Sequence, residues 1–270
     1  MIRRNLALAV SFSGLSALAL VLAPLRHTSA SPPLDPASRA ALAALEHDPA
    51  RAGAQVYEGA VSPLDPRDTT VVYRYDRRVH AHGVVRISSH ITHARSGAVV
   101  VLQRARHDDH YRLQSAEMIQ AQAGTTSAVT VTGDRARFTL ERAGRTTVAL
   151  ETIRDPLVAG PTIFGYILTH WQDLAAGRVL PVRFAVLERS QSIGFTLARA
   201  PAAPGRTVVR MTPSNPILRL FVATTSFEFE TDSRRILGYA GRVPTLERVG
   251  GGWRAMDARV RYAFTTPSFR

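Results

Sequence analysis

Histidine is unusually concentrated in one part of this chain. Six histidines fall within 31 residues, at His80, His82, His90, His93, His107 and His110. His80 and His82 would share one face of a strand, and a neighbouring strand could bring a third ligand to within about 5 Å. Such a group would suit zinc or copper.

Two features argue against a metal site. His90 and His93 would face opposite sides of a strand, and residues 106–110 are typical of a polar turn. We expect exposed histidines on the wet face of a sheet and predict no metal, with His80 and His82 as the alternative ligand pair.

Catalytic motifs are missing from the sequence. It contains no Gly-x-Ser-x-Gly elbow, no His-Glu-x-x-His, no phosphate-binding Gly-rich loop and no cysteine. Glu228 and Glu230 alternate with Phe227 and Phe229, which is typical of an amphipathic surface strand. A dispersed Ser/His/Asp triad stays open, because such partners meet only in the fold. We predict a protein that is not an enzyme and needs no cofactor.

The aromatic and aliphatic residues of the C-terminal half are better candidates for a site. They would face one interior, either as a packed core or as the wall of a cavity for an acyl chain or similar ligand. The candidates for such a wall are Phe164, Ile167, Leu168, Trp171, Phe184 and Phe195.

One helix must position the first four of these residues. Pro161 suits a first turn, Gly177 suits a helix end, and apolar residues recur between them at steps of three and four. The sequence therefore predicts a single amphipathic helix over residues 161–176.

Strands account for most of the remaining chain. From residue 55 the apolar pattern has a period of two, and Gly133-Asp134 and Ala143-Gly144 separate runs as hairpin turns do. An antiparallel sheet of ten or so strands tends to curl. We expect a mainly β fold, with a strongly curved antiparallel sheet or open barrel wrapped around the one helix. Residues 55–270 would form a single domain.

The N-terminus has the order of a secretory signal peptide. Arg3 and Arg4 precede an apolar run over residues 6–25, and Thr28-Ser29-Ala30 offers small side chains for cleavage. We assign residues 1–30 to a signal peptide and residues 31–54 to a flexible or short helical lead-in. Periplasmic localisation follows, with an uncleaved membrane anchor as the alternative.

Composition narrows the class of partner. The formal net charge is +13, and all 34 basic residues are arginine, scattered without a run of five. This pattern indicates a solvated basic surface, with peripheral contact to anionic lipid as the alternative, and no nucleic-acid partner. The absence of cysteine means that no disulfide can stabilise an exported fold.

Several segments in the C-terminal half share one pattern. They are Gly160-Pro161-Thr162 with Phe164, Trp171-Gln172-Asp173-Leu174 with Ala176-Gly177, residues 180–188, Ile193-Gly194-Phe195, residues 234–241 and residues 258–262. Together these segments resemble an uncharacterised family of proteobacterial periplasmic proteins, similar to the lipoprotein-localisation half-barrels. The resemblance implies a curved antiparallel sheet that wraps helices and holds acyl chains, and it carries no catalytic motif. Val243-Pro244 departs from the family pattern, which predicts a polar turn there.

Two functions remain open. The first is a non-catalytic periplasmic protein that binds a lipid or other hydrophobic molecule between sheet and helix. The second is a structural or assembly factor of the cell envelope that binds a protein partner without a small ligand. A cavity would favour the first, whereas a free sheet edge or exposed apolar patch would favour the second.

Overall fold

The computed structural model describes residues 55–82, 85–108, 110–220 and 222–265. The side chains of residues 55–57, 79–82, 85, 264 and 265 lie outside this description, as do the predicted signal peptide and lead-in segment.

All described strands belong to one sheet, in the order β8-β7-β6-β5-β4-β3-β2-β1-β15-β14-β13-β12-β11-β10-β9. We call β1–β8 the first arm and β9–β15 the second arm. The first arm comprises β1 (Gln55–Pro63), β2 (Tyr73–His82), β3 (Val85–Ala94), β4 (Val99–His107), β5 (Leu113–Gln120), β6 (Thr125–Thr132), β7 (Arg135–Arg142) and β8 (Arg145–Thr152). The second arm comprises β9 (Leu157–Val158), β10 (Leu180–Val186), β11 (Gln191–Ala200), β12 (Arg206–Pro213), β13 (Thr225–Glu230), β14 (Ile236–Val249) and β15 (Gly252–Thr265).

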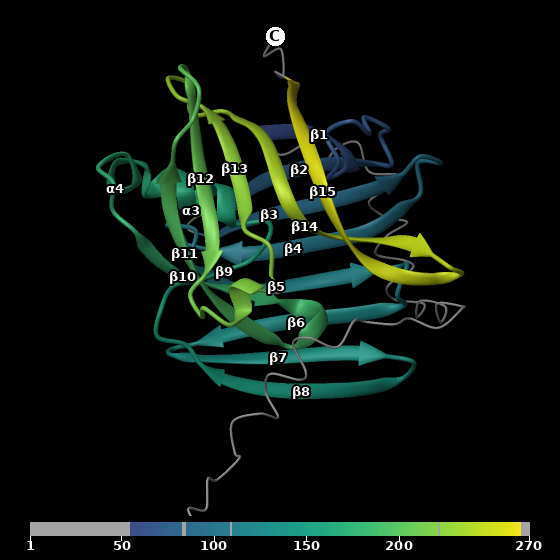
Figure 1. Cartoon of the computed structure of the whole chain (residues 1–270). Coiled ribbons are helices and arrows are strands. Elements are labelled where there is room, and N and C mark those ends of the chain that lie inside the picture. The colour runs from purple at the N-terminus through teal and green to yellow at the C-terminus, as the bar shows by residue number, and fades with distance from the viewer. Residues whose placement is uncertain (1–54, 83–84, 109, 221, 266–270) are drawn as a thin grey trace, which may run out of the picture.

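The sheet is curved and does not close. Its arms pair with each other at the centre through β1 and β15, and the second arm crosses the first in Figure 1. The edge formed by β9 and β10 turns inward, where Leu157 and Ala185 share a buried cluster with Met118 and Phe138 of the first arm. The mainly β, curved, antiparallel architecture is therefore confirmed.

The opposite edge, β8, is tied to the second arm by a side chain. The Glu151 carboxylate accepts a hydrogen bond from the Ser192 backbone N–H at 3.0 Å, and it also accepts one from the Ser192 hydroxyl. The Arg183 guanidinium lies 3.7 Å from the same carboxylate. Side chains thus join β8 to β10 and β11, with which it shares no ladder of backbone hydrogen bonds.

Alternation in the sequence matches the burial of the strands. Phe227 and Phe229 of β13 are buried, whereas Glu228 and Glu230 point to the other face, as an amphipathic strand requires. Positive backbone φ angles at Gly133, Ala143 and Gly144 place tight turns where the sequence predicts hairpins.

The predicted helix over 161–176 is wrong in its continuity. The structure forms two short helices, α3 (Ile163–Thr169) and α4 (Trp171–Ala175), separated at His170. The Thr169 hydroxyl donates to the Tyr166 carbonyl at 2.9 Å, where it competes with the His170 N–H at 3.2 Å. Such back-bonding from threonine bends helices, which accounts for the break. Short 3-10 turns also occur at η2 (Leu187–Arg189) and η3 (Leu218–Leu220).

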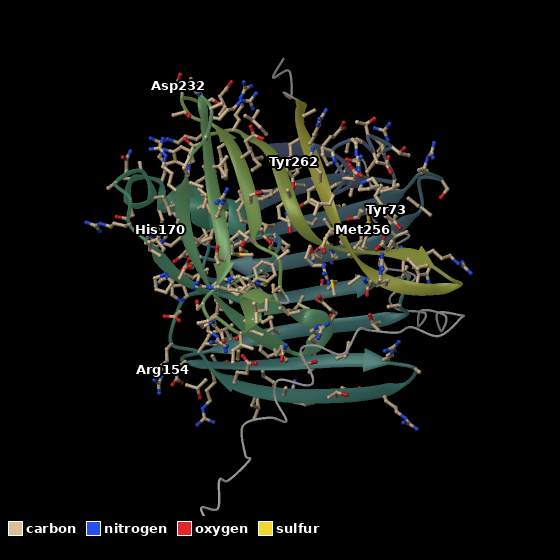
Figure 2. The ribbon with its side chains drawn as sticks, in the orientation of Figure 1. Tyr73, Arg154, His170, Asp232, Met256 and Tyr262 are labelled. Atoms are coloured by element: carbon tan, nitrogen blue, oxygen red, sulfur yellow. The ribbon has the colours of Figure 1, made fainter. Side chains whose placement is uncertain are left out.

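A glutamine side chain joins the two arms near their centre. The pairing of β14 with β15 is interrupted between Arg242 and Leu246. There the Gln122 side-chain amide pairs with the Leu246 backbone as a neighbouring strand would. It accepts a hydrogen bond from the Leu246 N–H at 2.9 Å and donates one to the Leu246 carbonyl at 3.0 Å. Tyr73, which lies beside Met256 in Figure 2, donates to the same carbonyl at 2.8 Å.

We expect Gln122→Ala to lower the free energy of unfolding by about 1–3 kcal/mol, because it leaves the buried Leu246 N–H without an acceptor. Chemical denaturation monitored by circular dichroism would measure the loss. Gln114→Ala, at an exposed position on β5, is the matched control and should change stability little. Equal stabilities of the two variants would contradict the bridging role of Gln122.

Candidate ligand cavity

A cavity of about 730 Å³ lies between α3 and the inner faces of both arms. This volume is within the range of small-molecule sites, roughly 300–1,000 Å³. The first arm contributes residues from β1 to β4, α3 contributes its first turn, and the second arm contributes residues from β10 to β15.

Three of the six predicted wall residues line this cavity: Phe164 of α3, Phe184 of β10 and Phe195 of β11. The rings of Phe184 and Phe195 meet edge to face at 6.4 Å. The Phe164 ring lies 5.5 Å from that of Tyr262, which Figure 2 labels on β15.

The other three, Ile167, Leu168 and Trp171, do not line it. α3 has only seven residues, and its first turn is the part that reaches the cavity, through Ile163 and Phe164. Ile167 and Trp171 are buried in the core cluster with β10–β13, and Leu168 packs against that cluster. These three residues are therefore core rather than wall.

The wall on β2–β4 is polar and buried. His90 is 5% exposed, and the Tyr75 ring stands edge-on to it at 4.8 Å. Thr92 and Gln103 lie on the same wall, and Gln103 is the register partner of His90 on β4. Burial holds the pKa of His90 well below its usual value; the Arg77 charge acts in the same direction, and a hydrogen bond with Gln103 opposes both.

Ion pairs between β14 and β15 form the charged part of the cavity lining. Arg242 Nε lies 2.7 Å from an Asp257 oxygen, and Arg254 lies 2.8 Å from Glu247. Together with Glu188 and Arg189 these residues give the lining three acids and three arginines, and burial raises the pKa of Glu188. This charged part of the lining is thus balanced in formal charge and gives little preference for anions or cations.

The histidine-rich stretch does not form a metal centre in the described residues, among which no three His, Cys, Asp or Glu side chains come together. The side chains of His80 and His82 lie outside the described part of the chain. The prediction of a polar turn over residues 106–110 is wrong at its start. His107 is the last residue of β4 and is fully buried.

Ser88 and His107 form a pair with the geometry of a nucleophile and its base. Ser88 Oγ lies 2.8 Å from His107 Nε2, and His107 Nδ1 lies 2.9 Å from the Asp108 carbonyl. Both side chains are 0% exposed, and neither lines the cavity. The pair therefore satisfies the hydrogen bonding of a buried histidine.

We expect stability to fall as pH drops below about 6.5, the ordinary histidine pKa. Burial lowers the pKa of both His90 and His107, so the unfolded chain binds more protons than the folded chain in this range. The free energy of unfolding should then decrease by up to about 1.4 kcal/mol per pH unit for each histidine. Denaturant unfolding at pH 7.5, 6.5 and 5.5 would measure this slope.

His90→Phe should reduce that slope by about half. Comparing the two proteins also cancels the opposite contribution of Glu188, whose raised pKa favours the folded state as pH falls. Identical slopes would contradict a neutral, buried His90.

Comparisons with known proteins found weak similarity to solved structures and no matching family. No family model matches it, and no curated protein matches it. The crystal structure of a β-barrel-like protein of the domain of unknown function DUF1849 from Brucella abortus is similar with a TM-score of 0.41 and 7% identity, covering 78% of this chain and 97% of its own. An acyl-CoA thioesterase II, TesB2, from Mycobacterium marinum gives a TM-score of 0.14 and 11% identity, covering 94% and 99%. TM-scores this low carry no inference about function.

The described residues contain no helix long and apolar enough to cross a membrane.

Sequence reasoning missed His90, Gln103 and Tyr75 as parts of the site. The signal that could have found His90 is the polar series Ser88, His90 and Thr92, which shares one face of β3.

Proposed function

We propose that this protein is a non-catalytic periplasmic protein that binds a lipid or other hydrophobic molecule in the cavity between the arms and α3. The observation that carries the proposal is the cavity itself, about 730 Å³ and lined by Phe164, Phe184, Phe195, Ile193 and Met211. An acyl chain in this space would exchange water for aromatic and aliphatic contacts, gaining roughly 25 cal/mol per Å² of buried apolar surface.

Periplasmic location is part of the proposal and rests on the pattern of residues 1–30. The similarity to lipoprotein-localisation half-barrels supports the same ligand class. The buried Ser88–His107 pair, which has no access to the cavity, supports a non-catalytic role.

Native mass spectrometry of protein purified gently from the periplasm tests this proposal, followed by lipid extraction. We expect a reproducible bound mass in the range of fatty acids or phospholipids. A bare polypeptide mass that stays unchanged after incubation with envelope lipids would overturn it.

A pair of matched variants locates the bound molecule. Met211→Trp places an indole ring in the cavity wall and should lower occupancy, whereas Leu150→Trp adds the same ring at a position 67% exposed. Circular dichroism would verify that both variants are folded. Equal occupancy in the two would place the ligand elsewhere.

The second candidate, an envelope assembly factor, is favoured by one observation. β8 is an edge strand of eight residues, and Val148 and Leu150 on it are 49% and 67% exposed. Such an edge can accept a strand from a partner. Crosslinking from a photoreactive residue at position 150 in envelope extracts would test this candidate, and a bare monomer band would count against it.

A further inference from the structure

His90 has a buried nitrogen atom to which the fold supplies no hydrogen-bond partner. Its Nε2 has no hydrogen-bond partner in the described structure, although the ring is 5% exposed and lines the cavity. Buried polar atoms are nearly always paired, and an unpaired one destabilises the protein that contains it. An unpaired nitrogen in a ring that lines a cavity suits a ligand that completes its hydrogen bonding.

The charges around His90 favour a negative partner. Arg77 is the register partner of His90 on β2, and its guanidinium lies 4.9 Å from the Phe164 ring centre. Arg77 is buried and donates to the Pro161 carbonyl at 3.1 Å, which fixes its charge behind this wall. The acids of the cavity lining, Glu188, Glu247 and Asp257, lie on η2 and the second arm.

The apolar residues of the cavity lining indicate the chemistry of the rest of the ligand. Across the cavity from the β2–β4 wall, the second arm contributes Phe184, Ile193, Phe195 and Met211. A buried polar wall on β2–β4 together with a group of apolar side chains on β10–β12 fits an amphiphile with a small head and a long tail.

We propose that the cavity binds a long-chain carboxylic acid whose carboxylate accepts a hydrogen bond from His90 Nε2 and whose hydrocarbon chain lies along the Phe184 and Phe195 wall. The inference rests on the proposed function and specifies its ligand. Esterification of the acid removes the acceptor charge that His90 and Arg77 favour.

The test compares palmitic acid, methyl palmitate and a diacyl phosphatidylethanolamine in titrations of delipidated full-length protein. We expect wild type to bind palmitic acid about 10- to 100-fold more tightly than methyl palmitate, since a hydrogen bond to a charged group is among the stronger ones. His90→Phe keeps a ring beside Tyr75 and should abolish this preference, while leaving methyl palmitate binding within about threefold. His90→Gln retains a donor and should keep most of the preference.

A second readout separates ligand binding from a structural role. Ligand-free His90→Phe should melt close to the wild-type temperature, because removal of the unpaired nitrogen offsets the loss of the hydrogen bond with Gln103. A lower melting temperature in both His90→Phe and His90→Gln would show that His90 stabilises the fold and would overturn the inference.

The other outcomes are equally decisive. Equal binding of acid and ester, or tighter binding of phosphatidylethanolamine, would overturn this inference and leave the proposed function standing. Binding of none of the three probes would overturn both.

Discussion

Trp171→Ala should lower the free energy of unfolding by about 3–5 kcal/mol, the cost of deleting a packed aromatic side chain. Trp171 is 8% exposed, and its ring meets that of Phe229 edge to face at 5.5 Å. The Arg234 guanidinium lies 5.6 Å from the ring centre on another side. Removing the indole would leave a void between α4 and the second arm, and the melting temperature should fall by about 6–20 °C.

Trp253→Ala is the matched control, because Trp253 is the second of the two tryptophans and is only partly buried on β15. We expect it to cost less than half as much. Lipid occupancy per folded molecule should be unchanged in Trp171→Ala, since Trp171 does not line the cavity. A stable Trp171→Ala that has lost its ligand would return Trp171 to the cavity wall.

Gly165→Ala should also destabilise strongly, although alanine is normally the better helix residue by about 1 kcal/mol. A Cβ at Gly165 would lie 2.0 Å from the Tyr111 ring. That ring cannot move freely, because it stacks on His107 with ring centres 4.4 Å apart. We expect a loss of at least about 1–3 kcal/mol in chemical denaturation.

A double-mutant cycle identifies the clash as the cause. Tyr111→Ala removes the obstructing ring, so Gly165→Ala should cost much less in that background. Gly194→Ala is the control, because a Cβ there finds its nearest neighbour at an ordinary 3.6 Å. Strictly additive losses would show that Tyr111 is not the obstacle.

The strands were predictable because most of them bury one face. In β13 the buried Phe227 and Phe229 alternate with Glu228 and Glu230, and the period of two in the sequence reports this directly. The break at His170 was not predictable from apolar spacing, since it depends on where the Thr169 hydroxyl finds an acceptor.

The cavity wall misled sequence reasoning for a definite physical reason. On β3, Ser88, His90 and Thr92 share one face and are buried, and His90 and Thr92 line the cavity, yet a polar series of this kind is typical of the solvent face. A polar cavity reverses the usual relation between polarity and exposure. Which residues meet across it depends on contacts between β3 and the second arm, which are far apart in the sequence.

The pairing of β1 with β15 has a consequence for folding kinetics. Among the described strands, every other antiparallel pairing joins strands that follow each other along the chain, so these pairings form between neighbours in sequence. The β1–β15 seam, which pairs Val61 with Val260, must instead close a loop of about 200 residues and should form late and slowly. A circular permutant that connects β15 to β1 by a short linker and opens the chain within residues 153–156 would make this seam local. We expect such a permutant to refold faster than the natural order of strands.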